Sequence, residues 1–153
     1  MVPGVRPLLA SMLLAGALST LGCAGVARGG LSAPQVRLQE IAAAEDGSLS
    51  LAIRVMNAAP RGVRVERLEL SLSLEKTPPV SLSESEAREL PPRAVEVYRF
   101  RLAAEQSPRL ASLASGSSLF WRLEGHVMLD GQRFPIEAEG RLDPVPGRPG
   151  LFY

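Results

Sequence analysis

The sequence has few of the residues that build reactive or metal-binding sites. Its 153 residues include one cysteine, Cys23, and one histidine, His126. A single cysteine excludes an intrachain disulfide. With no second soft ligand nearby in the sequence, neither a zinc cluster nor a Cys–His nucleophile pair can be built. We therefore expect no metal, no cofactor and no catalytic residue, and predict that the protein is not an enzyme.

Charge of one sign is also lacking. The formal net charge is +1, and Arg6 is the only charged residue before Cys23, so a chain that starts at Cys23 is close to neutral. No basic field exists that would hold nucleic acid. Hydrophobic residues make up 46% and charged residues 22%. This is ordinary globular composition, and the length is typical of one domain.

The strongest local pattern is a β-hairpin over residues 119–142. Asp130-Gly131 separates two alternating runs, as in a type I′ turn, which needs positive φ at both central residues. Folding the chain there pairs Trp121 with Gly140, so that a large side chain faces a small one. The register is well specified, because a slip by one residue would turn the apolar face to water.

The polar face and the second strand of this hairpin carry further signals. Glu124 opposes Glu137, an unfavourable pair that Arg122 is placed to offset. His126 lies on this face and is interpreted as a solvated strand residue, whereas Trp121 on the opposite face is assigned to the core. Pro135 donates no ladder hydrogen bond, so we predict that its strand lies at a sheet edge.

Other strands follow from alternating apolar residues between turn signals. They are predicted at residues 34–41, 48–57, 63–75, 80–83 and 94–102. The apolar phase changes at Glu66-Arg67, which predicts a bulge. Residues 94–102 are apolar on both sides, with Tyr98 assigned to the core, which favours a central position in a sheet. About seven short strands in total predict an all-β, antiparallel β-sandwich of the immunoglobulin or fibronectin-III-like kind.

Two more segments complete the domain. Ser107-Pro108 is a sound helix start and Gly116 a plausible stop, so one short helix is predicted there, closing an open end of the sandwich. Residues 143–153 contain three prolines and two glycines, and we expect them to be disordered or loosely draped. The predicted organisation is a signal peptide at 1–22, a flexible tether at 23–33, the sandwich at 34–143 and a Pro/Gly-rich tail at 144–153.

The leader resembles that of a bacterial lipoprotein. Arg6 gives a short basic region, residues 8–18 an apolar one, and a small residue precedes Cys23. In such proteins the cysteine is lipidated, and Cys23 is the one site residue that we predict. Ala24 after it resembles the outer-membrane case, which implies an exported, lipid-anchored envelope protein with its domain in the periplasm.

Two alternatives for the leader stay open. Ordinary signal cleavage near Ala24 or Ala27 would leave a soluble secreted protein. An uncleaved anchor is the other alternative, because residues 7–27 carry no charge and run to about 20 residues, the length that spans a bilayer.

The order of strands and turns along the chain resembles that of a known protein family. A strand ends in Asn57 before a turn and a strand that starts with Val63 and Val65; a Leu-x-Leu strand (68–74), a proline-preceded strand (90–102) and the Gly/Pro-containing hairpin follow. Over residues 34–142 this set resembles the late embryogenesis abundant type 2 family, the water-stress and hypersensitive-response domain. Ala58 departs from the pattern, since proline usually follows the asparagine.

That resemblance implies a β-sandwich with one helix, a role in tolerance to drying or other stress, and no catalytic residues to carry over. We therefore expect a non-catalytic, protective or structural envelope lipoprotein. Its partners would be the membrane, through the lipid anchor, and an apolar ligand or protein client. The alternative is a lipid or apolar-ligand binding or transfer module, in which the leucine strand lines a crevice; a continuous apolar cavity on the order of a few hundred Å³ would favour it.

Overall fold

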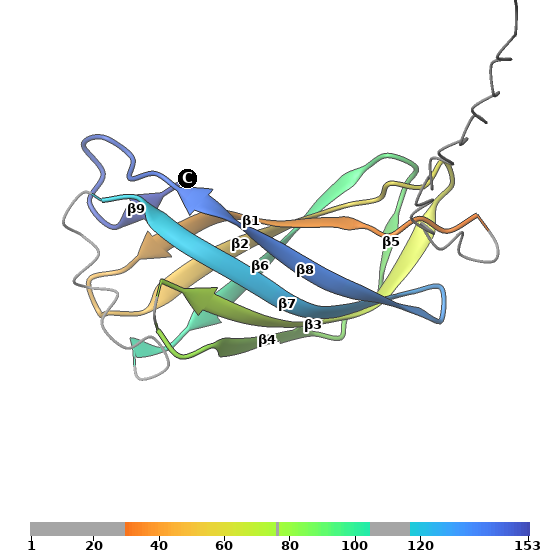
Figure 1. Cartoon of the computed structure of the whole chain (residues 1–153), viewed down its shortest axis with the longest axis horizontal. Coiled ribbons are helices and arrows are strands. Elements are labelled where there is room, and N and C mark those ends of the chain that lie inside the picture. Colours follow the sequence, from red (N-terminus) through yellow and green to blue (C-terminus); the bar gives the residue numbers. More distant parts are fainter. Residues whose placement is uncertain (1–29, 76, 105–116) are drawn as a thin grey trace, which may run out of the picture.

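The computed structural model describes residues 30–75, 77–104 and 117–153. Nine strands lie in these ranges (Figure 1). They are β1 (Gln35–Ala43), β2 (Leu49–Met56), β3 (Val63–Leu74), β4 (Val80–Glu84), β5 (Arg88–Leu90), β6 (Val95–Leu102), β7 (Leu119–Leu129), β8 (Gln132–Leu142) and β9 (Leu151–Phe152). The predicted leader with Cys23 and the predicted helix at 107–116 fall outside the described residues.

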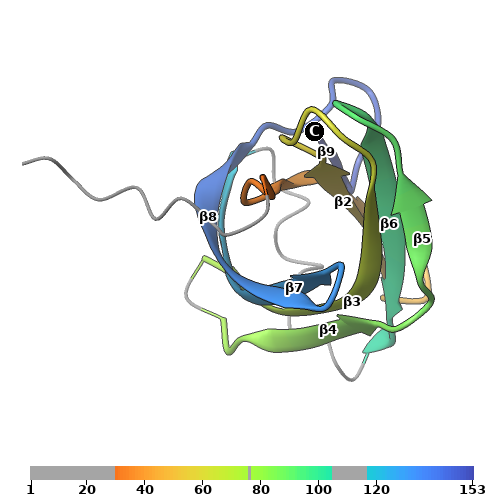
Figure 2. The same ribbon diagram turned by 90° about the vertical axis from the view of Figure 1, so that its right-hand side faces the viewer.

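The strands form two antiparallel sheets. Sheet A has the order β6-β2-β1-β9, and sheet B has the order β4-β3-β7-β8, with β5 paired to the first residues of β3. Seen end-on, the strands curve around a common interior, with β8 and β6 on opposite sides (Figure 2). The predicted all-β, antiparallel sandwich is therefore confirmed, whereas its kinship to immunoglobulin or fibronectin-III domains stays a prediction.

Alternating side chains from both sheets build the core. In β2 every second residue from Leu49 to Val55 is buried, and in β3 the leucines at 68, 70, 72 and 74 are buried in the same cluster. Burying one such side chain contributes about 1.5–3 kcal/mol, which makes this interior the main source of stability. The leucine strand packs against its neighbours and does not line an open crevice.

The hairpin has the predicted register. Trp121 pairs with Gly140, and every other predicted partner along β7 and β8 is also matched. Asp130 and Gly131 have φ values of 46° and 75°, as a type I′ turn requires. β8, with Pro135, lies at the edge of sheet B as predicted. Periodicity and turn chemistry suffice here because the two strands are adjacent in sequence.

The predicted bulge is also present. The register of β3 against β7 shifts between Val65 and Arg67, so that Glu66 is the additional residue. This extra residue moves the following leucines onto the face that Val65 occupies. Both apolar phases of β3 therefore point into one core.

Two expectations are wrong. β6 was expected to lie centrally, but it forms an edge of sheet A in the described structure, and Val95 on its outer face is 39% exposed. Apolarity on two faces therefore does not mark a buried strand here. Residues 143–153 were expected to be disordered or loosely draped, but β9 pairs with β1 and Phe152 is only 4% exposed. The prolines and glycines of this segment instead shape the turn that brings β9 back to the sheet.

Candidate functional site

Asn57 connects two loops at one end of the sandwich. It follows β2, is 1% exposed, and its side-chain Nδ2 donates to the backbone oxygens of Arg61 (2.7 Å), Leu90 (3.2 Å) and Pro91 (2.9 Å). Its Oδ1 accepts a hydrogen bond from the backbone N–H of Ala59 at 2.9 Å. The amide thus binds backbone groups of the β2–β3 turn and of the segment before β6, and its bonds to the Leu90 oxygen and the Ala59 N–H are buried. Ala58, in place of the usual proline, leaves this arrangement intact.

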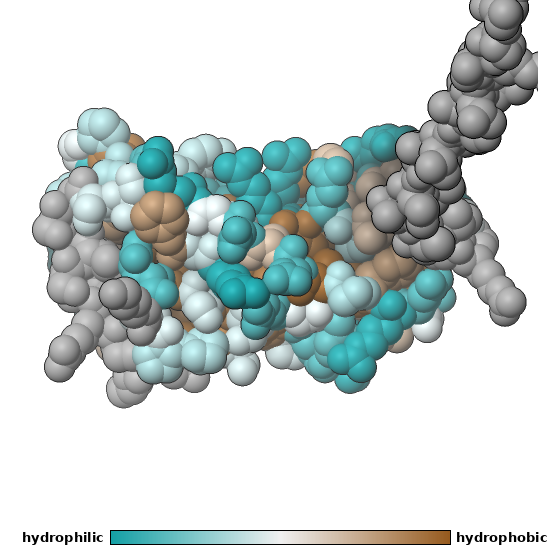
Figure 3. Space-filling view, viewed as in Figure 1, coloured by the Kyte–Doolittle hydropathy of each residue, from teal (hydrophilic) through white to brown (hydrophobic). Residues whose placement is uncertain are grey.

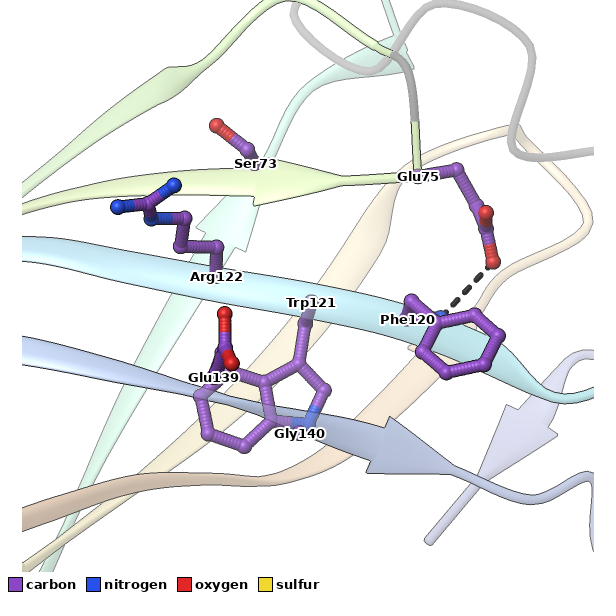
Figure 4. A pocket seen from close by; sticks show the side chains of 7 residues that line it. All are labelled: Ser73, Glu75, Phe120, Trp121, Arg122, Glu139 and Gly140. Carbon is purple, nitrogen blue, oxygen red and sulfur yellow. Dashed lines mark hydrogen bonds between the residues drawn. The ribbon is translucent and has the colours of Figure 1, made fainter.

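A groove of about 490 Å³ lies at the start of β7 (Figure 4). Phe120, 58% exposed, stands at its rim, and its backbone N–H donates to the Glu75 carboxylate at 2.8 Å. The buried Trp121 ring lies against Gly140, where a Cβ would come within 2.7 Å of its Cζ2 atom. Charged residues on β7 and β8, Arg122 and Glu139, also line this groove. It is therefore not the continuous apolar cavity that a lipid-transfer module requires.

Two buried polar atoms have no hydrogen-bond partner in the described structure: Trp121 Nε1 and the Tyr98 hydroxyl. Both residues lie in the core, as predicted. Burial raises the pKa of Tyr98 to about 12, although the Arg88 guanidinium, 5.0 Å from the centre of the ring, acts in the opposite direction. Arg88 is itself held by Glu96 at 2.8 Å. This phenol is a packing residue with a high pKa.

The polar face of the hairpin is tightly paired. His126 Nε2 lies 2.9 Å from Glu69 Oε2, and its Nδ1 lies 3.0 Å from the Arg133 guanidinium. Because a guanidinium only donates, Nδ1 accepts from Arg133 and Nε2–H donates to Glu69, so a neutral imidazole satisfies both contacts. His126 is thus half-buried and bound on both sides, and the expectation of a solvated residue is wrong.

The like-charged pair on this face is compensated as predicted. Arg122 lies 2.9 Å from a carboxylate oxygen of Glu124 and 2.9 Å from one of Glu137. The face of the molecule seen in Figure 3 is predominantly hydrophilic, with smaller hydrophobic patches between. Exposed pairs of this kind contribute little stability, but they leave few charges on this face free for a ligand.

A second groove, of about 420 Å³, lies on the outer face of sheet A. We call it the arginine groove. Its lining residues are Arg37, Gln39, Arg54, Val95, Val97 and Tyr153. No sequence pattern marks this groove, because its residues come from three strands and the C-terminal end, and only the register of sheet A brings them together.

The structure brings no reactive cluster together in the ranges it describes. Within them no group of three or more His, Cys, Asp or Glu residues is placed to hold a metal ion. Ser118 donates a hydrogen bond to Asp143, and this bond lowers the pKa of that carboxyl.

No helix in the described ranges is sufficiently long and apolar to span a bilayer.

No protein-family model matches the sequence, and no curated protein matches it. Among solved structures, the chain is similar to a candidate late embryogenesis abundant (LEA) protein, with 13% identity, coverage of 75% of this chain and 73% of that chain, and a TM-score of 0.48. A candidate ApaA protein from Bordetella pertussis gives 10% identity, 76% and 98% coverage, and a TM-score of 0.46. A protein from Archaeoglobus fulgidus has 10% identity, with coverage of 74% of this chain and 98% of that chain, and a TM-score of 0.42. Likenesses of this size concern the fold alone.

Proposed function

We propose that this chain is a lipid-anchored protein of the cell envelope whose β-sandwich, of the late embryogenesis abundant type 2 kind, protects membranes or proteins during drying or other stress without catalysis. In this proposal Cys23 carries the lipid and the domain lies in the periplasm at the outer membrane. The tether, predicted at residues 23–33, ends before Leu31, which is buried in the core.

The observation that carries the domain assignment is the environment of Asn57. In the family that the sequence resembles, a strand ends in an asparagine before a turn. Here the corresponding residue is buried and its amide binds backbone atoms of two separate loops. A side chain with so many backbone partners has few substitutes, which gives a physical reason for an asparagine at that point.

The proposed anchor has separate support, which comes from the leader. An apolar segment of the expected length ends at the sole cysteine of the chain. Metabolic labelling with a clickable palmitate analogue should mark the wild-type protein and leave Cys23→Ala unmarked. Ser19→Ala is the matched control, since it changes the leader and keeps the thiol. Equal labelling of the wild type and Cys23→Ala would refute the lipid anchor, and membrane fractionation of the same cells reports the compartment.

The protective role is tested in cells that lack the gene. We expect such cells to survive drying and rewetting less well than the parent strain, and the wild-type gene to restore survival. A gene carrying Cys23→Ala should restore less, because the domain is then not held at the membrane. Unchanged survival of the deletion strain across drying, heat and osmotic stress would contradict the proposal.

A further inference from the structure

The arginine groove places two like charges side by side. Arg37 on β1 and Arg54 on β2 are direct cross-strand partners, and Arg54 is in turn opposite Val97 on β6. Like charges directly opposite each other destabilise a sheet. The row Arg37–Arg54–Val97 is therefore unfavourable for the isolated domain unless an anion lies between or above the two guanidinium groups.

Within the described ranges neither of these arginines has an ion pair or a side-chain hydrogen bond. The arginines on the polar face of β7 and β8 differ, because Arg122 is held by two carboxylates and Arg133 by His126. On the face of sheet A itself, Arg101 is paired with Asp46 at 3.3 Å. The groove is thus a local positive site on an almost neutral chain.

Apolar and hydrogen-bonding groups flank the two charges. Val95 is 39% exposed and Val97 is half-buried, so both present methyl groups to the groove. On the other side, Gln39 donates to the Tyr153 hydroxyl at 3.1 Å. Guanidinium groups bind phosphate oxygens with two parallel hydrogen bonds. An amphipathic phosphate, with an apolar part against the valines, matches this arrangement.

One end of the groove, at Arg37 and Val95, lies where the chain enters the domain. Arg37 is near the start of β1, and the register places the first residues of β6 beside the same end of sheet A. The proposed tether comes before Leu31, which is buried in the core four residues ahead of β1. A domain held by Cys23 would therefore carry the groove close to the bilayer surface.

We propose that the arginine groove binds the phosphate group of an anionic phospholipid and so holds sheet A against the membrane to which the chain is anchored. This inference rests on the proposed function for its membrane. The lipid would supply the negative charge that Arg37 and Arg54 lack, and Val95 and Val97 would contact its glycerol and first acyl carbons.

The test uses the full chain in uncharged detergent micelles, titrated with dihexanoyl phosphatidylglycerol, dihexanoyl phosphatidylcholine or inorganic phosphate. Binding is followed by NMR shifts of the Gln39 side-chain amide and the Val95 and Val97 methyl groups. We expect saturable shifts with the phosphatidylglycerol. The double variant Arg37→Gln with Arg54→Gln should lower the affinity for this lipid roughly 30-fold, because two charges near an anionic lipid are lost. Arg64→Gln with Arg148→Gln is the matched control, since both arginines are exposed and lie outside the groove.

Three results would overturn the proposal: equal affinity for phosphatidylcholine, binding of inorganic phosphate as tight as that of the lipid, or equal affinity of the groove double variant and the control. If the Gln variant does not fold, Arg37→Lys with Arg54→Lys keeps the charge without the guanidinium fork and should bind several-fold more weakly than the wild type. Cys23→Ala should bind the lipid like the wild type, so a failed anchor and a failed groove give different results.

Discussion

At the scale of single residues, the buried Asn57 side chain makes four hydrogen bonds to backbone groups. Replacing it by alanine removes the hydrogen bonds to the Leu90 oxygen and to the buried N–H of Ala59; the Pro91 oxygen keeps the backbone N–H of Ala94 as a donor. We predict a loss of about 3 kcal/mol in the free energy of unfolding. Urea denaturation measures this loss. The control is Gln35→Ala, an exposed residue of β1, for which we expect almost no change in the free energy of unfolding. A change below about 0.5 kcal/mol would remove Asn57 from the account of the fold.

Tyr98 gives a prediction for alkaline pH. Its pKa in the folded protein is raised to about 12 by burial, above the value of 10.0 for an exposed phenol. Between pH 10 and 12 the unfolded chain ionises at Tyr98 while the folded chain resists, so the free energy of unfolding should fall by about 3 kcal/mol across this window. The contribution of the neutral Tyr98 phenol to the free energy of unfolding is fully present below pH 10 and is lost above pH 12. Tyr98→Phe should abolish that fall.

The control for this titration is Tyr153→Phe, because Tyr153 is 63% exposed. Lys76 is the sole lysine of the sequence, so few other groups titrate in the same window. An identical alkaline slope in the wild type and in Tyr98→Phe would show that the buried phenol is not the cause.

The burial of a side chain could be predicted from the sequence where it depends only on the alternation within its own strand. The core positions of Trp121 and Tyr98 follow from alternation within their own strands. The partner of His126 does not, because Glu69 lies on β3 and meets the histidine only through the β3–β7 register. The two arginines of the groove are separated in the same way.

At the scale of elements, Gly125 in the middle of β7 tests the close approach of β3. It has a φ of 150°, and a Cβ there would overlap the carbonyl oxygen of Glu69 and lie 2.9 Å from the Cα of Leu70. Both obstacles are backbone, so Gly125→Ala should cost about 3 kcal/mol or more. Gly131→Ala is the comparison: its φ is 75° but nothing lies within 4 Å, so only about 1 kcal/mol of backbone strain is expected. Equal losses in thermal or urea unfolding would contradict the close approach.

The elements predicted from sequence were those with a local cause. The hairpin register follows from one turn and one alternation, and the bulge follows from a phase change inside β3. The position of β6 at an edge of sheet A has no such local signal, since Val95 and Val97 give it the same pattern as a strand covered on both faces. β5, three residues long, is too short for any periodicity to show.

At the scale of the whole molecule, the C-terminal segment closes sheet A. Phe152 packs in the core and pairs with Ile41, although its neighbour Tyr153 is exposed. Phe152→Ala should therefore lower the free energy of unfolding by about 3 kcal/mol, the usual loss for a buried phenylalanine. Tyr153→Ala should change it by less than about 0.5 kcal/mol. If calorimetry gives the two variants the same melting temperature, the segment does not belong to the fold.

Sequence composition led to the wrong expectation for this segment, because prolines and glycines are as typical of an ordered turn as of a mobile tail. Backbone hydrogen bonds decide between the two: Tyr153 and Asp143 exchange a pair of them, at 3.0 and 3.1 Å. The all-β, antiparallel class of the fold could be predicted from alternation and turn signals. The arginine groove could not, because it depends on which strands are neighbours in sheet A.

Pro135 in β8 has a consequence for crowded conditions. When water is withdrawn, protein chains are forced together, and a long bare strand with a full row of amide donors is a template for fibril growth. β8 is one of the two edge strands of sheet B, and it is interrupted at Pro135, where a neighbouring molecule would find no donor to extend the ladder. Strand addition through the β8 edge should therefore stop at Pro135 when this protein is concentrated in a drying film.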